Sequence, residues 1–370
     1  MNKKILAVIS ISAVLALSAG AVLVKVFHWS QAVTRNQATL IKSLAEEGRA
    51  SGSLATSFRW QPDIGTVKVG DFRVHTKNYD INEDPGKVLA IGVGRSPKNW
   101  KPDIGRGLDA AIPLPWPEKY VEEYKQPFNF WSFFRNVQQL CAHFDETGSE
   151  ETRAILKALY DRLLEYSELR DGQRFGLYKF KQGYRSNSIP VEWPWTSAYA
   201  SGAALIGLSN MWECAKIDGA LDTAHEFLAA LSNPIDPREG RPQFWVSFVD
   251  DRGYLWFEEK PLDRIEQPRI LNGHIRTLVG LYEYYARTES EEALKLLRAG
   301  IRTIEEYAPY YRVPGKINAY DMLQPYNDDY GPKRTIGQQD ILYRMTNEPV
   351  FAIYRDVFEL DMRDEIAAGK

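Results

Sequence analysis

The chain has 370 residues, of which 44% are hydrophobic and 26% charged, and its formal net charge is -3. These values are ordinary for a globular protein and exclude a largely disordered chain. The near balance of charge also argues against a nucleic-acid-binding protein, which usually carries a basic excess. The chain holds 10 Trp, 20 Tyr and 16 Phe, and aromatic rings are suited to pack on the apolar faces of sugars.

The N-terminus predicts export. Lys3 and Lys4 precede an apolar run over residues 5–24, which is long enough to span a bilayer, and the positive-inside bias keeps the two lysines in the cytoplasm. We therefore expect residues 1–27 to form a single-pass membrane anchor, with the rest of the chain on the extracytoplasmic side, in a periplasm or lumen. A cleaved signal peptide is the alternative, because residues 19–21 (Ala-Gly-Ala) have the small-x-small form of a cleavage site.

Residues 28–51 follow as a polar stretch with helically spaced Leu40, Ile41 and Leu44, which predicts a juxtamembrane helical stalk. Residues 52–117 predict a small β-rich segment, because short apolar runs alternate with glycines and prolines there. The expected strands lie at residues 67–74 and 88–93.

Residues 118–362 are patterned as helices separated by polar loops. The pattern predicts a mainly α domain and no more. Its expected helices are Phe128–Thr147, Glu150–Arg170, Thr196–Lys216, Leu221–Ser232, Leu271–Thr288, Ser290–Tyr307 and Asp340–Phe358, with long loops at Gly172–Pro194 and Asn233–Pro268.

The two cysteines, Cys141 and Cys214, both fall in stretches of helical pattern and have no C-x-x-C partner. This spacing excludes a zinc site of the usual kind. An oxidising compartment would allow one disulfide, but we expect buried free thiols.

The stretch from Gly253 to Tyr285 carries the strongest indication of chemistry. An aromatic run over residues 254–257 ends in two adjacent carboxylates, Glu258 and Glu259, and a helical pattern starts after a polar loop. Asn272 and Gly273 stand where that helix begins, so its free N–H groups could point toward the carboxylates. Aromatic walls, a carboxylate base and a helix N-terminus predict a site for an anionic sugar.

Several short blocks resemble the C-terminal domain of D-glucuronyl C5-epimerases, the enzymes that convert glucuronate to iduronate in heparosan-type polysaccharides. The blocks are residues 256–261 (WFEEKP), 271–273 (LNG), 278–282 (LVGLY) and the small-residue helix at 195–204 (WTSAYASGAA). The resemblance covers roughly residues 118–348. Together with the loop pattern, it implies an (α/α) toroid that is preceded by the β-rich segment and the transmembrane helix.

Epimerisation needs a base on one face of the sugar, neutralisation of the carboxylate next to C5, and a proton donor on the opposite face. By resemblance, Glu259 is the base, Tyr343 the opposite acid and Tyr320 a supporting hydrogen-bond donor. Glu258 stays an alternative base. Tyr330 rivals Tyr343, because the spacing from Tyr320 to Tyr343 is longer than the family pattern and the histidines of that motif are absent.

Lys260 is a departure, because the family usually has a tyrosine directly after the glutamate pair. A cation there would lower the pKa of Glu259 unless the lysine binds the substrate carboxylate. The predicted substrate-binding residues combine stacking rings with cations, an amide and an imidazole for the carboxylate: Tyr184, Arg185, Trp193, Trp195, Lys260, Asn272 and His274.

No organic cofactor is expected. Family members can carry a structural calcium ion, for which the acidic cluster of Asp80, Asn82, Glu83 and Asp84 is a weak candidate, since no D-x-D-x-D-G loop occurs. The expected partners are a polyanionic uronate polysaccharide and the membrane, without nucleic acid, and the resemblance allows a homodimer. Two other functions stay open: a uronate polysaccharide lyase on the same fold, and a non-catalytic glycan-binding envelope protein.

Overall fold

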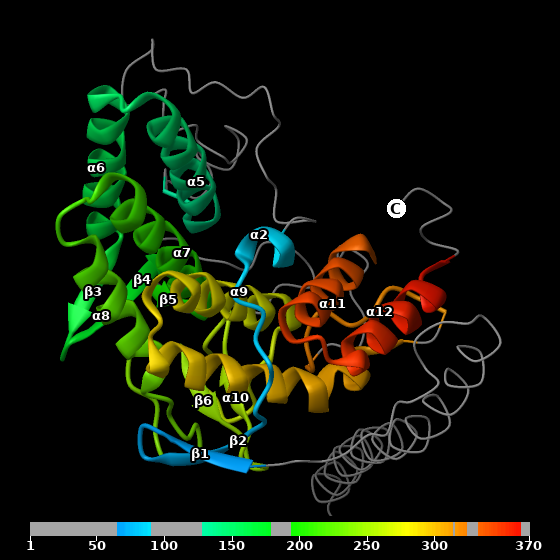
Figure 1. Ribbon diagram of the computed structural model, residues 1–370. Coiled ribbons are helices and arrows are strands. Elements are labelled where there is room, and N and C mark those ends of the chain that lie inside the picture. The colour runs from blue at the N-terminus through cyan, green and yellow to red at the C-terminus, as the bar shows by residue number, and fades with distance from the viewer. Residues whose placement is uncertain (1–64, 90–127, 179–193, 314, 324–331, 364–370) are drawn as a thin grey trace, which may run out of the picture. The chain divides into compact units, whose positions relative to one another are not determined.

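The computed structural model describes residues 65–89, 128–178, 194–313, 315–323 and 332–363. The chain divides into two compact units, Met1–Trp60 and Gln61–Lys370, and all described residues belong to the second. This part is mainly helical, as predicted (Figure 1). Its long helices are α5 (Phe130–Thr147), α6 (Glu150–Glu165), α7 (Ala198–Ala215), α8 (Ala220–Ser232), α9 (Leu271–Thr288), α10 (Glu291–Tyr307), α11 (Pro332–Thr346) and α12 (Pro349–Asp361).

Helices α7 and α9 pack against each other through glycines. A Cβ atom on Gly280 of α9 would lie 2.4 Å from the backbone oxygen of Gly202 on α7. Similarly, a Cβ on Gly207 would lie 2.3 Å from the ring of Phe133 on α5. Small residues therefore let the axes of α5, α7 and α9 approach closely.

The helix at residues 271–288 has the predicted bounds, because its apolar periodicity is unbroken and Glu289 ends it with φ 54°. The predicted helix 150–170 is too long. It ends at Glu165, and β3 (Ser167–Arg170) and β4 (Gln173–Tyr178) follow as an antiparallel hairpin. Asp171 and Gly172 connect the two strands with φ values of 50° and 76°, as a two-residue hairpin turn requires.

The predicted helix 340–358 is also wrong, because the structure has two helices there, α11 and α12. Asn347 adopts φ 55°, which ends α11, and Pro349 starts α12 at its first turn, where a missing N–H costs nothing. Val88 was predicted to start a strand, but it ends the short helix α2 (Pro85–Val88), which Asp84 caps.

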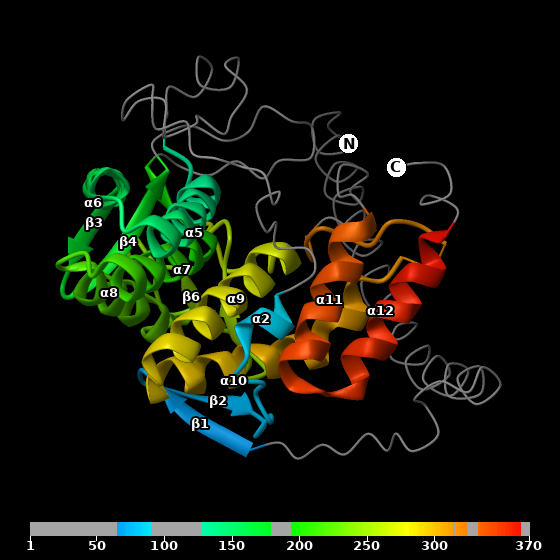
Figure 2. The ribbon, with the colours of Figure 1, turned by 45° about the horizontal axis from the view of Figure 1, so that its top comes forward.

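The predicted strands at 67–74 are confirmed as the hairpin of β1 (Gly65–Val69) and β2 (Phe72–Thr76). The hairpin lies along α10 (Figure 2). Inside the predicted loop 233–268, β6 (Ser247–Val249) and β7 (Leu255–Phe257) form a further antiparallel pair. A short strand, β5 (Trp195–Thr196), pairs with β4, and a 3-10 turn (Ala308–Tyr311) follows α10.

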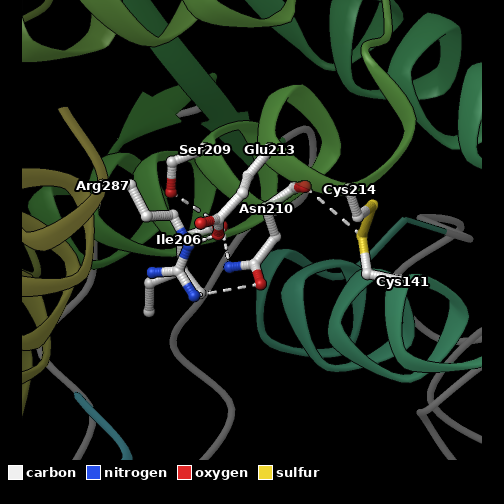
Figure 3. Close-up of a disulfide and its surroundings, with 7 residues drawn as sticks. All are labelled: Cys141, Ile206, Ser209, Asn210, Glu213, Cys214 and Arg287. Carbon is white, nitrogen blue, oxygen red and sulfur yellow. Dashed lines mark hydrogen bonds and ion pairs between the residues drawn. A yellow bond between two sulfur atoms is a disulfide. The ribbon is translucent and has the colours of Figure 1, made fainter. Parts of the chain in front are cut away.

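A disulfide joins Cys141 of α5 to Cys214 of α7, which corrects the prediction of free thiols (Figure 3). The Cα atoms are 5.6 Å apart, which is within the usual range for a disulfide. The packing of α5 on α7 brings these residues together across 73 positions of sequence. Beside it, Arg287 of α9 donates to Glu213 of α7 at 2.8 Å, and these two side chains tie α7 to α9.

The predicted anchor at 1–27 and stalk at 28–51 lie outside the described residues, as do the predicted boundaries at 51 and 117. These assignments stay predictions. Within the described ranges, no helix is long and apolar enough to cross a membrane.

Candidate active site

The two carboxylates lie where β7 ends. The backbone N–H of Glu258 donates to the carbonyl of Val246 at 2.8 Å, which extends the β6–β7 pairing by one residue. On the other side, the N–H of Ala198 donates to the carbonyl of Glu258 at 2.9 Å. The glutamate pair is therefore fixed by its backbone between the β6–β7 hairpin and the first turn of α7.

Glu258 is fully buried and holds the following loop in place. Its Oε1 accepts from the N–H of Lys260 at 3.1 Å, and its Oε2 accepts from the N–H of Arg269 at 2.7 Å. Burial raises the pKa of Glu258 to about 8, although the two amide donors act in the opposite direction. Because both oxygens already accept backbone hydrogen bonds, Glu258 is a structural residue in this arrangement and a poor candidate for the base.

Glu259 is partly exposed, and its side chain has different hydrogen-bond partners from that of Glu258. Its Oε1 accepts from the hydroxyl of Tyr320 at 2.8 Å. Its Oε2 is buried and has no hydrogen-bond donor among the described residues. A carboxylate oxygen that is held in place but has no donor of its own is able to receive a proton.

Gly273, in the first turn of α9, makes room for this carboxylate. A Cβ atom at this position would lie 2.3 Å from Cβ of Glu259 and 2.7 Å from Oε2. The Glu259 side chain thus packs directly on the backbone of the helix start, and only glycine allows it. The sequence predicts that the carboxylates lie beside the start of this helix, as they do here.

Lys260 is 5% exposed, and its Nζ lies 5.5 Å from the centre of the Tyr320 ring. This is the distance range of a cation–π interaction. The lysine thus packs on the ring of the tyrosine that donates to Glu259. The backbone carbonyl of Tyr320 in turn accepts from the N–H of Leu271, so the start of α9 also fixes this tyrosine.

Asn272 and His274, which are also predicted to contact the substrate carboxylate, have hydrogen-bond partners within the protein. Asn272 accepts at Oδ1 from Nε2 of Gln338 on α11 at 2.7 Å. His274 is fully buried: its Nδ1 accepts from the N–H of Phe257 and its Nε2 donates to the carbonyl of Gly300, each at 3.0 Å. Burial lowers the pKa of this imidazole to about 4, so the ring is neutral and holds β7 and α10 against α9. His274 is therefore not placed to contact a substrate.

The predicted stacking residues are described only in part. Trp195 lies in β5, 7% exposed, and stacks on Tyr178 of β4 with ring centres 4.2 Å apart. Tyr184, Arg185 and Trp193 lie outside the described residues.

Tyr343 lies on α11 and is partly exposed. Gln338 on the same helix bonds to Asn272, next to the carboxylate site, and Tyr343 follows five residues later. At a rise of about 1.5 Å per residue, this is some 7–8 Å farther along the helix axis. No hydrogen bond between Tyr343 and Glu259 occurs in the described part of the chain. The rival Tyr330 lies outside it.

The structure adds a tyrosine that the sequence did not single out, Tyr199 in the first turn of α7. Burial raises its pKa well above the ordinary value, nearby Arg276 lowers it, and Glu259 raises it; Arg334 and Arg135 lower it further. The charges of Glu259 and of three guanidinium groups therefore act on the phenol of Tyr199. Its only indication in the sequence is its place in the small-residue block at residues 195–204.

Calcium binding stays a prediction. Asp84 of the suggested cluster caps α2 by accepting from the N–H of Lys87 at 3.2 Å, and Asn82 accepts from the N–H of Asp84 at 3.0 Å. Among the described residues, no group of three or more His, Cys, Asp or Glu side chains is arranged to hold a metal ion.

The site thus combines a carboxylate and a phenol that are hydrogen-bonded to each other, and guanidinium charges act on a second phenol, that of Tyr199. A base with a free oxygen can remove a weakly acidic C–H proton, phenols can donate or accept protons, and guanidinium groups can neutralise a carboxylate. The arrangement suits proton transfer at a carbon next to a carboxylate.

Comparison with known proteins gives a match to a family model and a distant likeness to a solved structure. The family model "D-glucuronyl C5-epimerase C-terminus" matches residues 170–359. A solved structure, unsaturated glucuronyl hydrolase from Streptococcus agalactiae, is 14% identical with a TM-score of 0.37, over 69% of this chain and 66% of that chain. No curated protein matches the sequence. The family match spans more than half of the chain and includes Glu259, Tyr320 and Tyr343, and the chain therefore belongs to the D-glucuronyl C5-epimerase C-terminal family.

Proposed function

We propose that the protein is an epimerase that inverts C5 of D-glucuronate to L-iduronate in a heparosan-like polysaccharide. Family membership supports an isomerase of this kind. The observation that carries the proposal is the Glu259 carboxylate, which is held at Oε1 by Tyr320 while its Oε2 has no donor in the described part.

In the proposed mechanism, Glu259 removes the C5 proton, and the electron pair of the broken C–H bond moves into the adjacent carboxylate. This step is difficult because the C5 proton is only weakly acidic, so the doubly charged enediolate must be stabilised. The charges of Arg276, Arg334 and Arg135 act on the phenol of Tyr199, as does that of Glu259, and we assign this stabilisation to these guanidinium groups. A proton is then added to the opposite face of C5. By resemblance Tyr343 is the donor.

Tyr320 has the supporting role in this mechanism. Its hydroxyl orients the Glu259 carboxylate, and the Lys260 ammonium group stacked on its ring stabilises negative charge on the phenol. Lys260 is thus engaged with Tyr320, which favours a role in tuning the base over direct binding of the substrate.

The proposal extends to the fold and the location. Sequential helices pack in pairs, α7 with α8, α9 with α10 and α11 with α12, which supports an (α/α) toroid. The Cys141–Cys214 disulfide supports an oxidising, extracytoplasmic compartment. This agrees with the proposed membrane anchor at residues 1–27. We further propose a polyanionic uronate polysaccharide as partner and a homodimer, with no organic cofactor and with Tyr184, Arg185, Trp193 and Trp195 as sugar contacts.

The test is to incubate the chain after residue 27 with heparosan-type polymer in D₂O and to follow C5 by NMR. Deuterium at C5 together with new iduronate signals is the expected result. Unsaturated ends without iduronate would instead show a lyase, which also removes the C5 proton but expels the 4-substituent. Absence of any exchange on heparosan and on other uronate polymers would refute the proposal and favour a glycan-binding protein.

A matched pair of variants tests the assignment of the base. Glu259→Gln should abolish exchange with little change in melting temperature, because it keeps the size of the side chain and removes the proton acceptor. Glu258→Gln should mainly lower the melting temperature, since its carboxylate accepts two backbone N–H groups. The reverse pattern would make Glu258 the base.

A further inference from the structure

A cavity of about 370 Å³ lies between the β3–β4 hairpin and the loop of residues 233–245, which follows α8. This volume is in the range of ordinary small-ligand pockets. The walls combine aromatic rings with polar side chains, among them Phe175, Phe244, Trp245, Arg170, Gln173 and Gln243. None of these residues takes part in the proposed proton transfer, so the cavity is distinct from the groups that carry the chemistry.

Both walls of the cavity are fixed by hydrogen bonds. On one side, Nε of Arg174 in β4 donates to Glu226 of α8 at 2.6 Å, which holds the hairpin on this helix. On the other side, the N–H of Ile235 donates to the carbonyl of Ser247, and the N–H of Val249 donates to the carbonyl of Ile235, each at 3.0 Å. The start of the loop is thus paired with β6. The cavity is therefore preformed, which reduces the entropic cost of binding a ligand.

The charges in the wall of the cavity are balanced. Arg170 is the only cation among the described lining residues, and Asp171 in the hairpin turn adds a carboxylate. The guanidinium group of Arg170 donates to Glu168 and, at 3.0 Å, to Oε1 of Gln243. It also lies 4.2 Å from the centre of the Phe244 ring. The described lining thus offers no uncompensated positive charge to an anionic sugar, whereas a neutral sugar finds ring faces for its C–H groups and amides for its hydroxyls.

The cavity lies close to the proposed base. Trp245 lines the cavity, and the carbonyl of the next residue, Val246, accepts from the N–H of Glu258 at 2.8 Å. Even when fully extended, the chain from Gln243 to Val246 spans at most about 11 Å. Glu259 directly follows Glu258 in the sequence. The cavity and the Glu259 carboxylate are therefore within reach of one polysaccharide chain of several sugars.

We propose that this cavity is a sugar-binding subsite that holds a neutral residue of the polysaccharide while a uronate of the same chain lies at Glu259. The inference rests on the proposed function and adds a specificity for the neighbouring sugar. In a heparosan-like polymer the neutral residue is the N-acetylhexosamine that alternates with glucuronate. Its C–H face packs on the rings of Phe175 and Phe244, and Gln173 and Gln243 bind its polar groups. The subsite fixes the register of the chain, so that a uronate meets the base.

The experiment measures the Kd of heparosan oligosaccharides for wild type and for the double variant Gln173→Ala/Gln243→Ala by isothermal titration calorimetry. Gln243 is exposed and Gln173 is half-buried, so the fold should tolerate both changes. Loss of two hydrogen bonds should raise Kd about 30-fold. KM for C5 exchange should rise by the same factor at unchanged kcat, because the cavity does not touch the reacting atoms. As the matched control, Leu169→Ala alters an exposed residue of the same hairpin outside the lining and should keep the wild-type Kd.

The salt dependence tests the charge of the bound sugar. Salt screens interactions between charges, so the ratio of the two Kd values should be the same at about 0.1 M and about 1 M NaCl. A ratio that falls toward one at high salt would make the occupant a uronate and overturn the proposal. A double variant that is folded by circular dichroism and binds as tightly as wild type would overturn it as well.

Binding and catalysis can fail separately in this design. If wild type binds the oligosaccharides with the expected ratio to the double variant but exchanges no C5 proton, the epimerase function fails and the subsite stands. If wild type exchanges C5 and the double variant has the wild-type Kd and KM, the subsite fails and the epimerase function stands. Absence of binding to wild type would overturn the subsite.

Discussion

The contact between Gly273 and Glu259 gives the sharpest test of how the base is positioned. In Gly273→Ala the new Cβ would lie 2.3 Å from Cβ of Glu259, whereas ordinary contacts begin near 3.4 Å. The two atoms therefore have to separate by about 1 Å. A displacement of about 1 Å in a reacting group costs roughly 100-fold in rate, or about 2.7 kcal/mol of transition-state stabilisation. We expect kcat for C5 exchange to fall by about this factor.

Stability should change far less than activity in this variant. Overpacking costs about 1–3 kcal/mol, but alanine is favoured over glycine within a helix by about 1 kcal/mol, and the two effects partly cancel. The assay is C5 exchange in D₂O, with thermal unfolding of the same sample. Full activity at an unchanged melting temperature would refute the argument that this contact positions Glu259.

Two other glycines serve as controls. A Cβ on Gly337 of α11 meets no atom within 4 Å. Gly337→Ala should therefore raise the free energy of unfolding by up to about 1 kcal/mol and leave activity unchanged. In Gly280→Ala the Cβ would lie 2.4 Å from the backbone oxygen of Gly202, and backbone cannot rotate away as a side chain can. This variant should lose stability and activity together.

The remaining predictions concern Tyr320, the buried His274 and the disulfide. Tyr320→Phe removes a hydrogen bond to the Glu259 carboxylate, an interaction of about 1.5–3 kcal/mol, so exchange and inversion should both slow about 10- to 100-fold; equal rates for variant and wild type would contradict the supporting role. Folding lowers the pKa of His274 from 6.5 to about 4, so between these pH values the unfolded chain binds a proton that the folded chain does not. The neutral imidazole therefore contributes fully to the free energy of unfolding above pH 6.5, and this contribution is lost as the pH falls toward 4, with a slope of up to about 1.4 kcal/mol per pH unit. Denaturant unfolding at several pH values should show this slope for wild type but not for His274→Gln. Replacing Cys141 and Cys214 together by serine opens a loop of 73 residues and should lower the free energy of unfolding by about 2–4 kcal/mol, measured against wild type without reductant; equal stabilities would show that the cross-link does not form.

The local pattern of the sequence was enough to predict features that depend on neighbouring residues. The helix at 271–288 appears with the predicted bounds, because its apolar period and the break at Glu289 are both local properties. The placement of Glu259 beside a helix start also followed from the order of residues in one short stretch. The same reasoning failed at residues 167–170, where a change from helix to hairpin depends on pairing with β4.

The tertiary structure decided which groups can take part in chemistry. Glu258 and Glu259 are adjacent and identical in type, but two backbone amides occupy the oxygens of Glu258, while one oxygen of Glu259 has no described donor. His274 looked available in the sequence and is enclosed between Phe257 and Gly300. The guanidinium charges that act on Tyr199 come from three helices far apart in the chain. Sequence periodicity reports which face of an element is buried, whereas hydrogen-bond partners and electrostatic neighbours depend on contacts between distant segments, which only the folded chain brings together.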